Sequence, residues 1–304
     1  MKIVIIGPGA MGCLFAGLLK EAGHDVCLLD KRTDRAATIA QQGLRIEDRV
    51  GDRTIPISAT ARAETLKGAG LVVICVKAYD TGSTIPELLA LISDRTLILT
   101  LQNGLGNVEQ LAAGINPAQV FAGVTAHGST LLGVGHVRHA GIGPTTIGSL
   151  HPEHYDRARE LATMLSQAGL LTTAAQDMTT VLWSKLIINA AIGPLSALSG
   201  LPNGQLPEQA EWSDLLQQTA KESAGVAARK SIRLLYDDPV QAVIEVCRNT
   251  SENFSSMLQD IRRGRQTEVD AINGIIVQEA AALHMPAPVN ENLVQRIRKL
   301  GRIS

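Results

Sequence analysis

The stretch KIVIIGPGAMGCLFAGLLKEAG, residues 2–23, decides the fold. A short apolar run leads into GPGAMG at residues 7–12, and an apolar segment with helical spacing follows directly. Strand, glycine-rich turn and helix in this order are typical of a unit that binds the phosphates of a dinucleotide. Gly7 would permit the tight turn, Gly9 would let the backbone approach a pyrophosphate, and Gly12 would let the helix pack against the strand. The sequence therefore predicts that these three glycines form part of a cofactor site.

The chain after this unit alternates short apolar runs with helical segments up to about residue 150. Such alternation predicts a doubly wound parallel sheet covered by helices. The expected strands cover residues 3–6, 26–29, 71–76, 96–100 and 120–124, and the first helices cover 10–22 and 33–41. Further expected elements are a hairpin within residues 44–57, antiparallel strands added to the parallel ones up to residue 147, a helix over 152–167 and a strand over 170–173.

Strand signals end near residue 177, and apolar residues then recur at helical spacing. The expected helices include residues 181–192, 215–228, 240–247, 269–283 and 293–297. The sequence therefore predicts an α/β protein in two parts. A Rossmann-type dinucleotide-binding domain covers residues 1–175, and an all-α domain that completes the substrate and catalytic site covers residues 176–304.

The composition favours a globular protein without a nucleic-acid partner. Hydrophobic residues make up 45% of the 304 residues, charged residues 19%, and the net charge is -1. The cluster Arg262, Arg263 and Arg265 is too small to form a nucleic-acid surface. The apolar run at residues 3–6 is too short for a signal peptide or a membrane span. We expect a cytoplasmic protein, with a helical face as a candidate homodimer interface.

The end of the second expected strand bears on the choice of cofactor. Asp30 lies 18 residues after Gly12, where a carboxylate binds the adenine-ribose hydroxyls of NAD. Lys31 and Arg32 follow directly, and either would pair with the 2′-phosphate of NADP. The two positive charges outweigh the one negative charge, which favours NADPH with Lys31 or Arg32 as the phosphate clamp. NADH is the alternative, because Asp30 would bind its ribose.

Two polar loops follow later strands of the expected sheet. Lys77 comes after residues 71–76, and Asn103 comes after residues 96–100. Open α/β sheets hold ligands at the carboxyl ends of their strands. We expect Lys77 to contact the ribose or pyrophosphate of the cofactor, and Asn103 to orient the nicotinamide ribose or the substrate.

Lys185 is the candidate proton donor. Hydride transfer to a ketone creates a developing alkoxide, which needs a nearby ammonium or acid. Lys185 lies in a mostly apolar helical segment, where a cation is unfavourable without a partner or a task. Asn189 lies four residues later, on the same helix face, where it would bond a substrate hydroxyl or hold the lysine. The plain alternative is a lysine that reaches solvent from the helix edge.

Several segments together resemble the ketopantoate reductase (2-dehydropantoate 2-reductase) family from end to end. They are the fingerprint, Lys77-Ala78, QNGLG at 102–106, GVTAHG at 123–128, WSKL at 183–186, PNG at 202–204, NFSSMLQD at 253–260, Thr267-Glu268 and ING at 272–274. The resemblance implies NADPH-dependent reduction of 2-dehydropantoate to (R)-pantoate, a step towards pantothenate.

The resemblance also assigns roles to residues of this chain. It implies that Lys185 is the catalytic acid and that Glu268 assists it, with Glu268 also near the cofactor. It implies that Asn103, Asn189, Asn253 and Ser256 bind substrate or cofactor. Without the resemblance, Glu268 reads as an acid in the first turn of a helix.

The sequence also allows other substrates and other functions. Some family members carry a substrate-binding asparagine where this chain has Gly193, and the lost hydrogen bond opens the site to another 2-keto acid. A β-hydroxyacid dehydrogenase or an imine reductase is disfavoured by the segment 253–268, and a non-catalytic NADPH sensor by Lys185 and Glu268. A metal site built from His127, His136 and His139 is not expected, because acids are absent around them and hydride transfer needs no metal.

Overall fold

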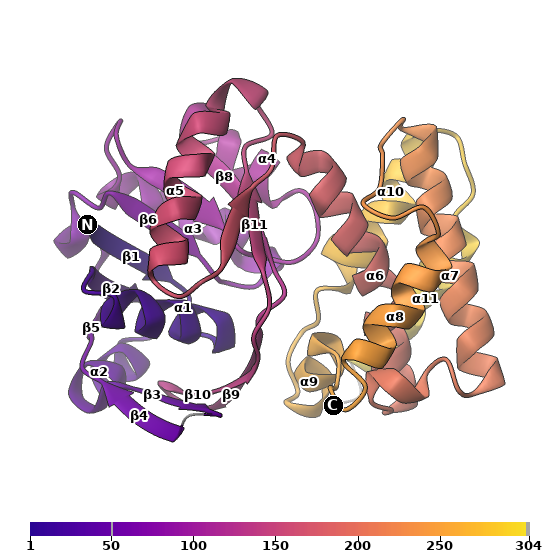
Figure 1. Cartoon of the computed structure of the whole chain (residues 1–304), viewed down its shortest axis with the longest axis horizontal. Helices are drawn as coiled ribbons and strands as arrows, with labels where there is room; N and C mark the ends of the chain where they lie inside the picture. Colours follow the sequence, from indigo (N-terminus) through magenta and orange to yellow (C-terminus); the bar gives the residue numbers. More distant parts are fainter. Residues whose placement is uncertain (50, 302–304) are drawn as a thin grey trace. The chain divides into compact units, whose positions relative to one another are not determined.

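The protein is described by a computed structural model that covers residues 1–49 and 51–301. It divides into two compact units (Figure 1). The first, here called the sheet unit, contains Met1–Gln102 and Asn107–Met178. The second, here called the helical unit, contains Asn103–Gly106 and the chain from Thr179 onward.

The sheet unit is built on an eight-stranded sheet in the order β12-β11-β8-β7-β6-β1-β2-β5. Every neighbouring pair is parallel except β8 and β11, so the doubly wound prediction is confirmed. The strands are β1 (Lys2–Ile6), β2 (Asp25–Leu29), β5 (Ser58–Thr60), β6 (Leu71–Ile74), β7 (Leu97–Thr100), β8 (Val120–Thr125), β11 (Thr145–Gly148) and β12 (Thr172–Ala174).

Helices cover this sheet and close its core. They are α1 (Ala10–Glu21), α2 (Thr33–Gln42), α3 (Thr81–Leu91), α4 (Asn107–Ala112) and α5 (Tyr155–Gln167). Leu14, Phe15 and Leu19 of α1 are fully buried in the same apolar cluster as Ile3 and Ile5 of β1. Burial of such side chains stabilises the unit by about 1.5–3 kcal/mol each.

A second sheet lies apart from the first within the sheet unit, with the order β4-β3-β10-β9 (Figure 1). Its strands are β3 (Leu44–Asp48), β4 (Gly51–Ile55), β9 (Gly128–Gly133) and β10 (His136–Gly141). The hairpin prediction is confirmed by the antiparallel pair β3 and β4. The prediction that the later antiparallel strands join the parallel sheet is right for β11 and wrong for β9 and β10.

Packing against α1 explains the second sheet. Ile46 of β3 and Val137 of β10 are fully buried in the core around α1. A Cβ on Gly17 of α1 would lie 2.4 Å from Ile46 Cδ1, so the helix approaches this sheet closely because position 17 is a glycine. The apolar side of β10 therefore packs against α1, and β10 pairs with β3 in the second sheet. No local feature of the sequence indicates that it pairs there.

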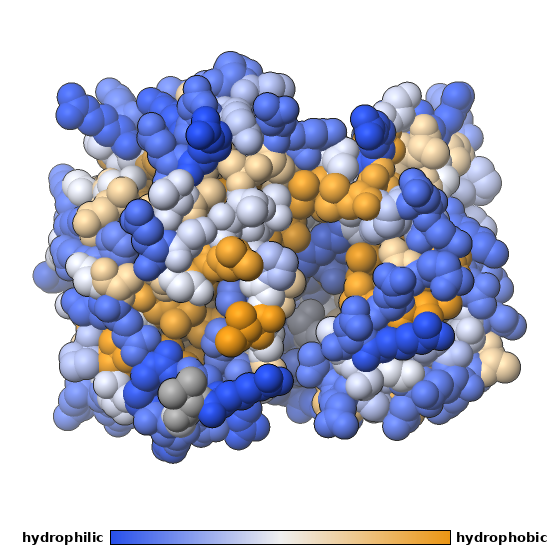
Figure 2. All heavy atoms as spheres, in the orientation of Figure 1, coloured by the Kyte–Doolittle hydropathy of each residue, from blue (hydrophilic) through white to orange (hydrophobic). Residues whose placement is uncertain are grey.

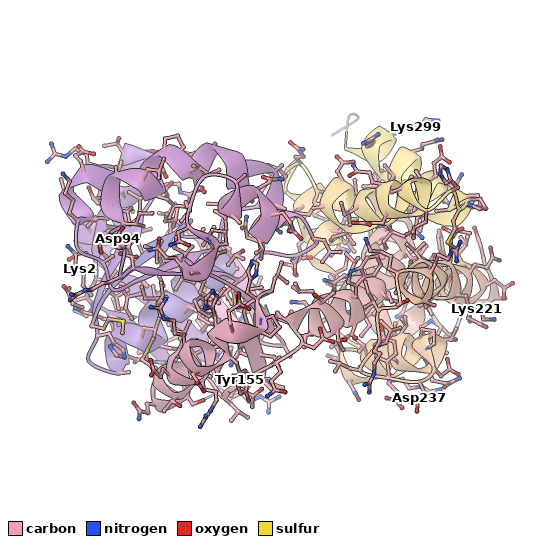
Figure 3. The ribbon with its side chains drawn as sticks, turned by 90° about the horizontal axis from the view of Figure 1, so that it is seen from above. Lys2, Asp94, Tyr155, Lys221, Asp237 and Lys299 are labelled. Carbon is pink, nitrogen blue, oxygen red and sulfur yellow. The ribbon has the colours of Figure 1, made fainter. Side chains whose placement is uncertain are left out.

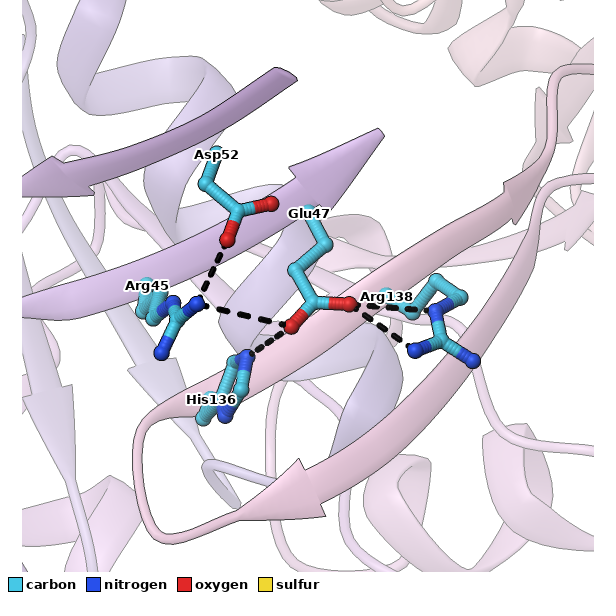
Figure 4. Close-up of polar contacts among 5 residues, drawn as sticks. All are labelled: Arg45, Glu47, Asp52, His136 and Arg138. Carbon is cyan, nitrogen blue, oxygen red and sulfur yellow. Dashed lines mark hydrogen bonds and ion pairs between the residues drawn. The ribbon is translucent and has the colours of Figure 1, made fainter. Parts of the chain in front are cut away.

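Charged side chains connect three strands of the second sheet (Figure 4). Glu47 of β3 accepts hydrogen bonds from Arg138 at 2.9 Å and pairs with His136 at 2.8 Å, both on β10. Arg45 of β3 pairs with Asp52 of β4. The hydrogen bond from Arg138 holds the pKa of Glu47 below its ordinary value.

The helical unit consists of helices apart from the segment Asn103–Gly106 and the connecting loops. Its helices are α6 (Met178–Ser199), α7 (Ala210–Arg229), α8 (Pro239–Asn249), α9 (Ser256–Arg262), α10 (Ile275–Ala282) and α11 (Pro288–Leu300), with a π-helical turn at Asp270–Gly274. The sequence missed α9 and predicted one helix over 269–283, where the structure has the π-helical turn followed by α10.

α6 is the central helix of this unit. Leu186, Ile187, Ala190 and Leu195 are buried in its apolar cluster. Within the described residues, α6 is the one helix long and apolar enough to cross a membrane, and 67% of its most apolar window is buried inside the protein. Its buried side chains belong to the apolar cluster of the unit, as those of a core helix do.

Hydrophilic residues dominate the face of the molecule seen in Figure 2. In the helical unit Lys221, Asp237 and Lys299 are exposed and extend outward from the ribbon (Figure 3). The helices of this unit thus present a charged outer side and an apolar inner side.

We expect Gly12→Ala to lower the free energy of unfolding by roughly 1–3 kcal/mol or more, because overpacking a close backbone approach is destabilising. A Cβ at Gly12 would lie 2.2 Å from the carbonyl oxygen of Gly7, whereas a Cβ at Gly9 would meet no atom within 4 Å. Gly9→Ala is therefore the matched control, with an expected change below about 0.5 kcal/mol. Urea denaturation followed by circular dichroism measures both, and equal losses would contradict the packing role of Gly12.

Candidate active site

The glycine-rich turn of the sheet unit connects β1 to α1 as the fingerprint predicts. Gly7 has a φ of +93°, and a Cβ there would lie 2.8 Å from the backbone nitrogen of Val76, so only glycine fits. Gly7 N–H donates to the Leu29 carbonyl at 3.1 Å, and Cys13 N–H donates to the Gly9 carbonyl at 3.0 Å. Gly9 caps α1 without a side-chain partner, so the first amides of α1 are available to an anion.

The candidate cofactor residues follow three neighbouring strands. β1 lies between β2 and β6, so Gly7, Asp30 and Lys77 all come after the carboxyl ends of adjacent strands. Lys77 is half-buried, and its carbonyl accepts the N–H of Asp80 at 2.8 Å to close a 3-10 turn at Ala78–Asp80. This edge of the sheet is where doubly wound folds bind nucleotides.

The two candidate phosphate clamps already hold carboxylates. Lys31 Nζ lies 3.1 Å from Asp80 Oδ1, and Arg32 Nη2 lies 2.6 Å from Asp34 Oδ2. Both cations are exposed, so these pairs are weak and open to exchange with a stronger anion. Residues 30–32 carry a net positive charge in the sequence. In the structure Asp80 and Asp34, which lie outside this run, offset that charge.

In the helical unit, Lys185 lies partly buried on α6. Burial lowers the pKa of its ammonium to about 8, and the negative charge of Glu268 opposes that shift. Glu268 directly precedes the helical segment that starts at Val269, and it is only 6% exposed. Asn103 Nδ2 donates to Glu268 Oε2 at 3.5 Å. The structure thus brings Lys185, Glu268 and Asn103 together within one unit.

A close backbone contact holds Asn103 in this unit. The next residue, Gly104, has a φ of +81°, and a Cβ there would lie 2.2 Å from the Ala271 carbonyl oxygen. Leu105 N–H donates to the same carbonyl at 3.1 Å. Asn103 and Gly104 therefore belong to a segment that packs against the π-helical turn beside Glu268.

Asn273, which sequence reasoning missed, ties that π-helical turn to α6. Pro194 has no N–H, so α6 cannot supply the usual donor to the Ala190 carbonyl. Asn273 Nδ2 donates to this carbonyl at 3.0 Å and to Asn290 Oδ1 of α11 at 2.9 Å. The signal was a proline inside an apolar helix, which implies an unpaired carbonyl in need of an outside donor.

The remaining candidate substrate residues lie on or beside α6. Asn189 is half-buried, one turn after Lys185, whereas Asn253 and Ser256 are exposed around the start of α9. Ser255 Oγ donates to the Gly193 carbonyl at 3.1 Å, which fastens the start of α9 to α6. The segment with Asn253 and Ser256 is thus held one turn beyond Asn189.

The three histidines do not act together. His127 Nδ1 lies 2.9 Å from His139 Nε2, and burial lowers the pKa of both side chains. His136 instead bonds to Glu47. Across residues 1–49 and 51–301, no group of three or more His, Cys, Asp or Glu side chains is placed to hold a metal ion.

The sequence comparisons agree on one family. The sequence model described as ketopantoate reductase PanE/ApbA matches residues 3–152, and its C-terminal counterpart matches residues 177–301. The 2-dehydropantoate 2-reductase of Halobacterium salinarum is 33% identical over 99% of each chain. A PanE/ApbA family ketopantoate reductase from Ralstonia eutropha JMP134 has a TM-score of 0.90 at 32% identity, covering 100% of this chain and 99% of that chain. A D-mandelate dehydrogenase solved with NADH has a TM-score of 0.89 at 25% identity, with the same coverage.

We expect Glu268→Gln to lower the pKa of Lys185 further below about 8, because the carboxylate charge opposes the effect of burial. NMR titration of lysine Cε signals measures this pKa directly, and a Lys185→Arg variant identifies the signal. Glu279→Gln, which removes an acid paired with Lys230, is the control and should leave the Lys185 signal unchanged. An unchanged or higher pKa in Glu268→Gln would contradict the proximity of the two charges.

We expect Asn273→Ala to lower the free energy of unfolding by roughly 2–4 kcal/mol, because it leaves the Ala190 carbonyl oxygen and the Asn290 side-chain oxygen without this donor. Asn292→Ala, on the exposed side of α11, should change it by less than about 0.5 kcal/mol. Chemical denaturation of both variants provides the comparison, and similar small losses would show that the amide bridge contributes little.

Proposed function

This chain belongs to the ketopantoate reductase family, and we propose that it reduces 2-dehydropantoate to (R)-pantoate with NADPH in the cytoplasm, a step towards pantothenate. The observation that carries the proposal is the placement of Lys185 beside a buried Glu268 and Asn103 in an apolar helical unit. Burial of an ammonium is unfavourable, so a lysine kept in such surroundings indicates a functional role.

The residues of the sheet unit fit a nicotinamide dinucleotide. Gly9 leaves open space where any other side chain would stand, and the uncapped amides of α1 suit a pyrophosphate. We assign Gly7, Gly9, Gly12 and Lys77 to its phosphates and ribose. Bound there, the dinucleotide supplies the hydride.

Lys185 would stabilise and then protonate the oxygen of the substrate ketone. As the keto carbon receives hydride, its oxygen gains negative charge, and an ammonium within hydrogen-bond distance stabilises that charge. The proton then passes from Lys185 Nζ to the alkoxide, which gives the alcohol and a neutral amine that is reprotonated from solvent. A pKa of about 8 leaves Lys185 mostly charged at pH 7 and makes its proton easier to release than that of an ordinary lysine.

Glu268 would keep Lys185 charged and, with Asn103, orient the substrate or the nicotinamide ribose. Asn189, Asn253 and Ser256 are assigned to substrate hydroxyl and carboxylate groups. Glu268, bonded to Asn103, lies near a cation on a mostly apolar helix, and a few polar groups in apolar surroundings suit a small anionic keto acid.

Two exposed cations support NADPH as the cofactor. Lys31 and Arg32 hold their acids through exposed pairs and are free to turn to a 2′-phosphate. Asp30 supports NADH instead, because a carboxylate at this position accepts the hydroxyls of an unphosphorylated ribose.

Reduction of a different 2-keto acid is the second candidate, and Gly193 favours it. A Cβ at this position would meet only Met257, with its terminal methyl at 3.5 Å, so the space on α6 after Asn189 is apolar and not filled by a polar side chain. A substrate lacking the terminal hydroxyl of 2-dehydropantoate would lose no hydrogen bond at that point.

The test is a steady-state assay of NADPH oxidation with 2-dehydropantoate and with 2-keto acids that lack its hydroxyl. We expect Lys185→Ala to lower kcat by roughly 10²–10⁴-fold while the Kd for NADPH is kept, because the phosphate-binding turn lies in the sheet unit. Lys221→Ala, at an exposed position on α7, is the control. Normal turnover by Lys185→Ala would refute the role of this lysine, and turnover of the other keto acids alone would move the substrate assignment to the second candidate.

A further inference from the structure

A buried carboxylate follows β2, and its two oxygens have different partners. Asp30 is 4% exposed. Its Oδ1 accepts the N–H of Arg32 at 3.1 Å. Its Oδ2 is buried and has no hydrogen-bond donor among the described residues. A buried carboxylate oxygen without a hydrogen-bond donor needs a nearby positive charge.

The counter-charge of Asp30 comes from Arg35, which sequence reasoning did not consider. Arg35 Nε of α2 lies 2.6 Å from Asp30 Oδ2, near enough for strong charge attraction but without the alignment of a hydrogen bond. The side chain of Arg35 is 26% exposed, so part of it reaches the surface. Arg35 thus neutralises the charge of Asp30 at this oxygen.

The other charges near Asp30 do not substitute for Arg35. Lys31 pairs with Asp80 and Arg32 side chain pairs with Asp34. Glu87 of α3 feels the charges of both Asp30 and Lys31, and burial raises its pKa. The exposed Arg32 guanidinium also feels the charge of Asp30 but is paired with Asp34, so removing Arg35 would leave the Asp30 carboxylate without a cation in direct contact.

We propose that Arg35 determines the choice between NADPH and NADH by cancelling the charge of Asp30. The two dinucleotides differ only at the adenosine ribose, where one has a hydroxyl and the other a phosphate. A hydroxyl donates to a carboxylate oxygen, whereas a phosphate is repelled by it. With Arg35 in place the site accepts the phosphate, and Lys31 and Arg32 then attract it. The inference rests on the dinucleotide site of the proposed function, but not on the substrate.

The experiment measures the Kd of NADPH and of NADH by isothermal titration calorimetry on the full chain, without substrate. Arg35→Met should weaken NADPH by roughly 10–100-fold and leave NADH within about threefold, since one unscreened charge pair at this range has that order of effect. Asp30→Asn should weaken NADH and tighten NADPH. Arg159→Met, which removes an exposed arginine 3.5 Å from Asp156 on α5, should change neither value.

The double variant Asp30→Asn with Arg35→Met separates the two ways in which Arg35 could act. If Arg35 acts through Asp30, removal of both charges restores NADPH binding to within about threefold of the unaltered chain. A double variant as weak as Arg35→Met alone would overturn the proposal, because Arg35 would then bind the phosphate directly. An unchanged NADPH to NADH ratio in Arg35→Met would overturn it as well.

Two further outcomes are informative. Should Arg35→Met fail to fold, Asp30→Asn alone decides, because an unchanged cofactor ratio in that variant contradicts the proposal. If the unaltered chain binds neither dinucleotide, the cofactor site and this inference both fail. If it binds one of them but does not reduce 2-dehydropantoate, the substrate assignment fails and the role of Arg35 stands.

Discussion

The helical unit depends on keeping one ammonium charged among apolar side chains. The fall in the pKa of Lys185 from 10.5 to about 8 corresponds to about 3 kcal/mol against the charged form. The surrounding structure limits this penalty with the carboxylate of Glu268 and holds that carboxylate through Asn103. Burial thus lowers the pKa of Lys185 and the charge of Glu268 raises it. The result is an ammonium with a pKa of about 8.

The rest of the unit can be understood as support for that balance. Pro194 exposes a carbonyl in the middle of α6, and Asn273 uses it to fix the π-helical turn that follows Glu268. Gly104 and Leu105 then seat Asn103 against the same turn. Local departures from regular helix at Pro194 and at Asp270–Gly274 are stabilised by each other, which is how irregular backbone is commonly kept at functional sites.

Much of the fold was predictable, because the signals were local. The glycines of residues 7–12 indicate the turn, and the continuous apolar runs of β1 and β6 indicate buried strands. Lys185 is recognisable as a single charge in an apolar helical segment. What escaped prediction depends on partners distant in the chain. β10 pairs with β3 across about 90 residues, and Asn273 donates to the Ala190 carbonyl 83 residues earlier in the chain. α9 is a short helix set by the cap at Ser255 and by its bond to Gly193, so its helical period was too brief to recognise.

The assignment of Asn103–Gly106 to the helical unit has a consequence for the protein as a whole. The chain passes between the two units three times, after Gln102, after Gly106 and after Met178, so no single cut separates them. A fragment that starts at Thr179 lacks a piece of its own interior packing, including the residues seated on Ala271. The two units therefore cannot be exchanged as independent modules, and a gene fusion or recombination event that brought in a new helical partner would have to bring in this four-residue loop as well.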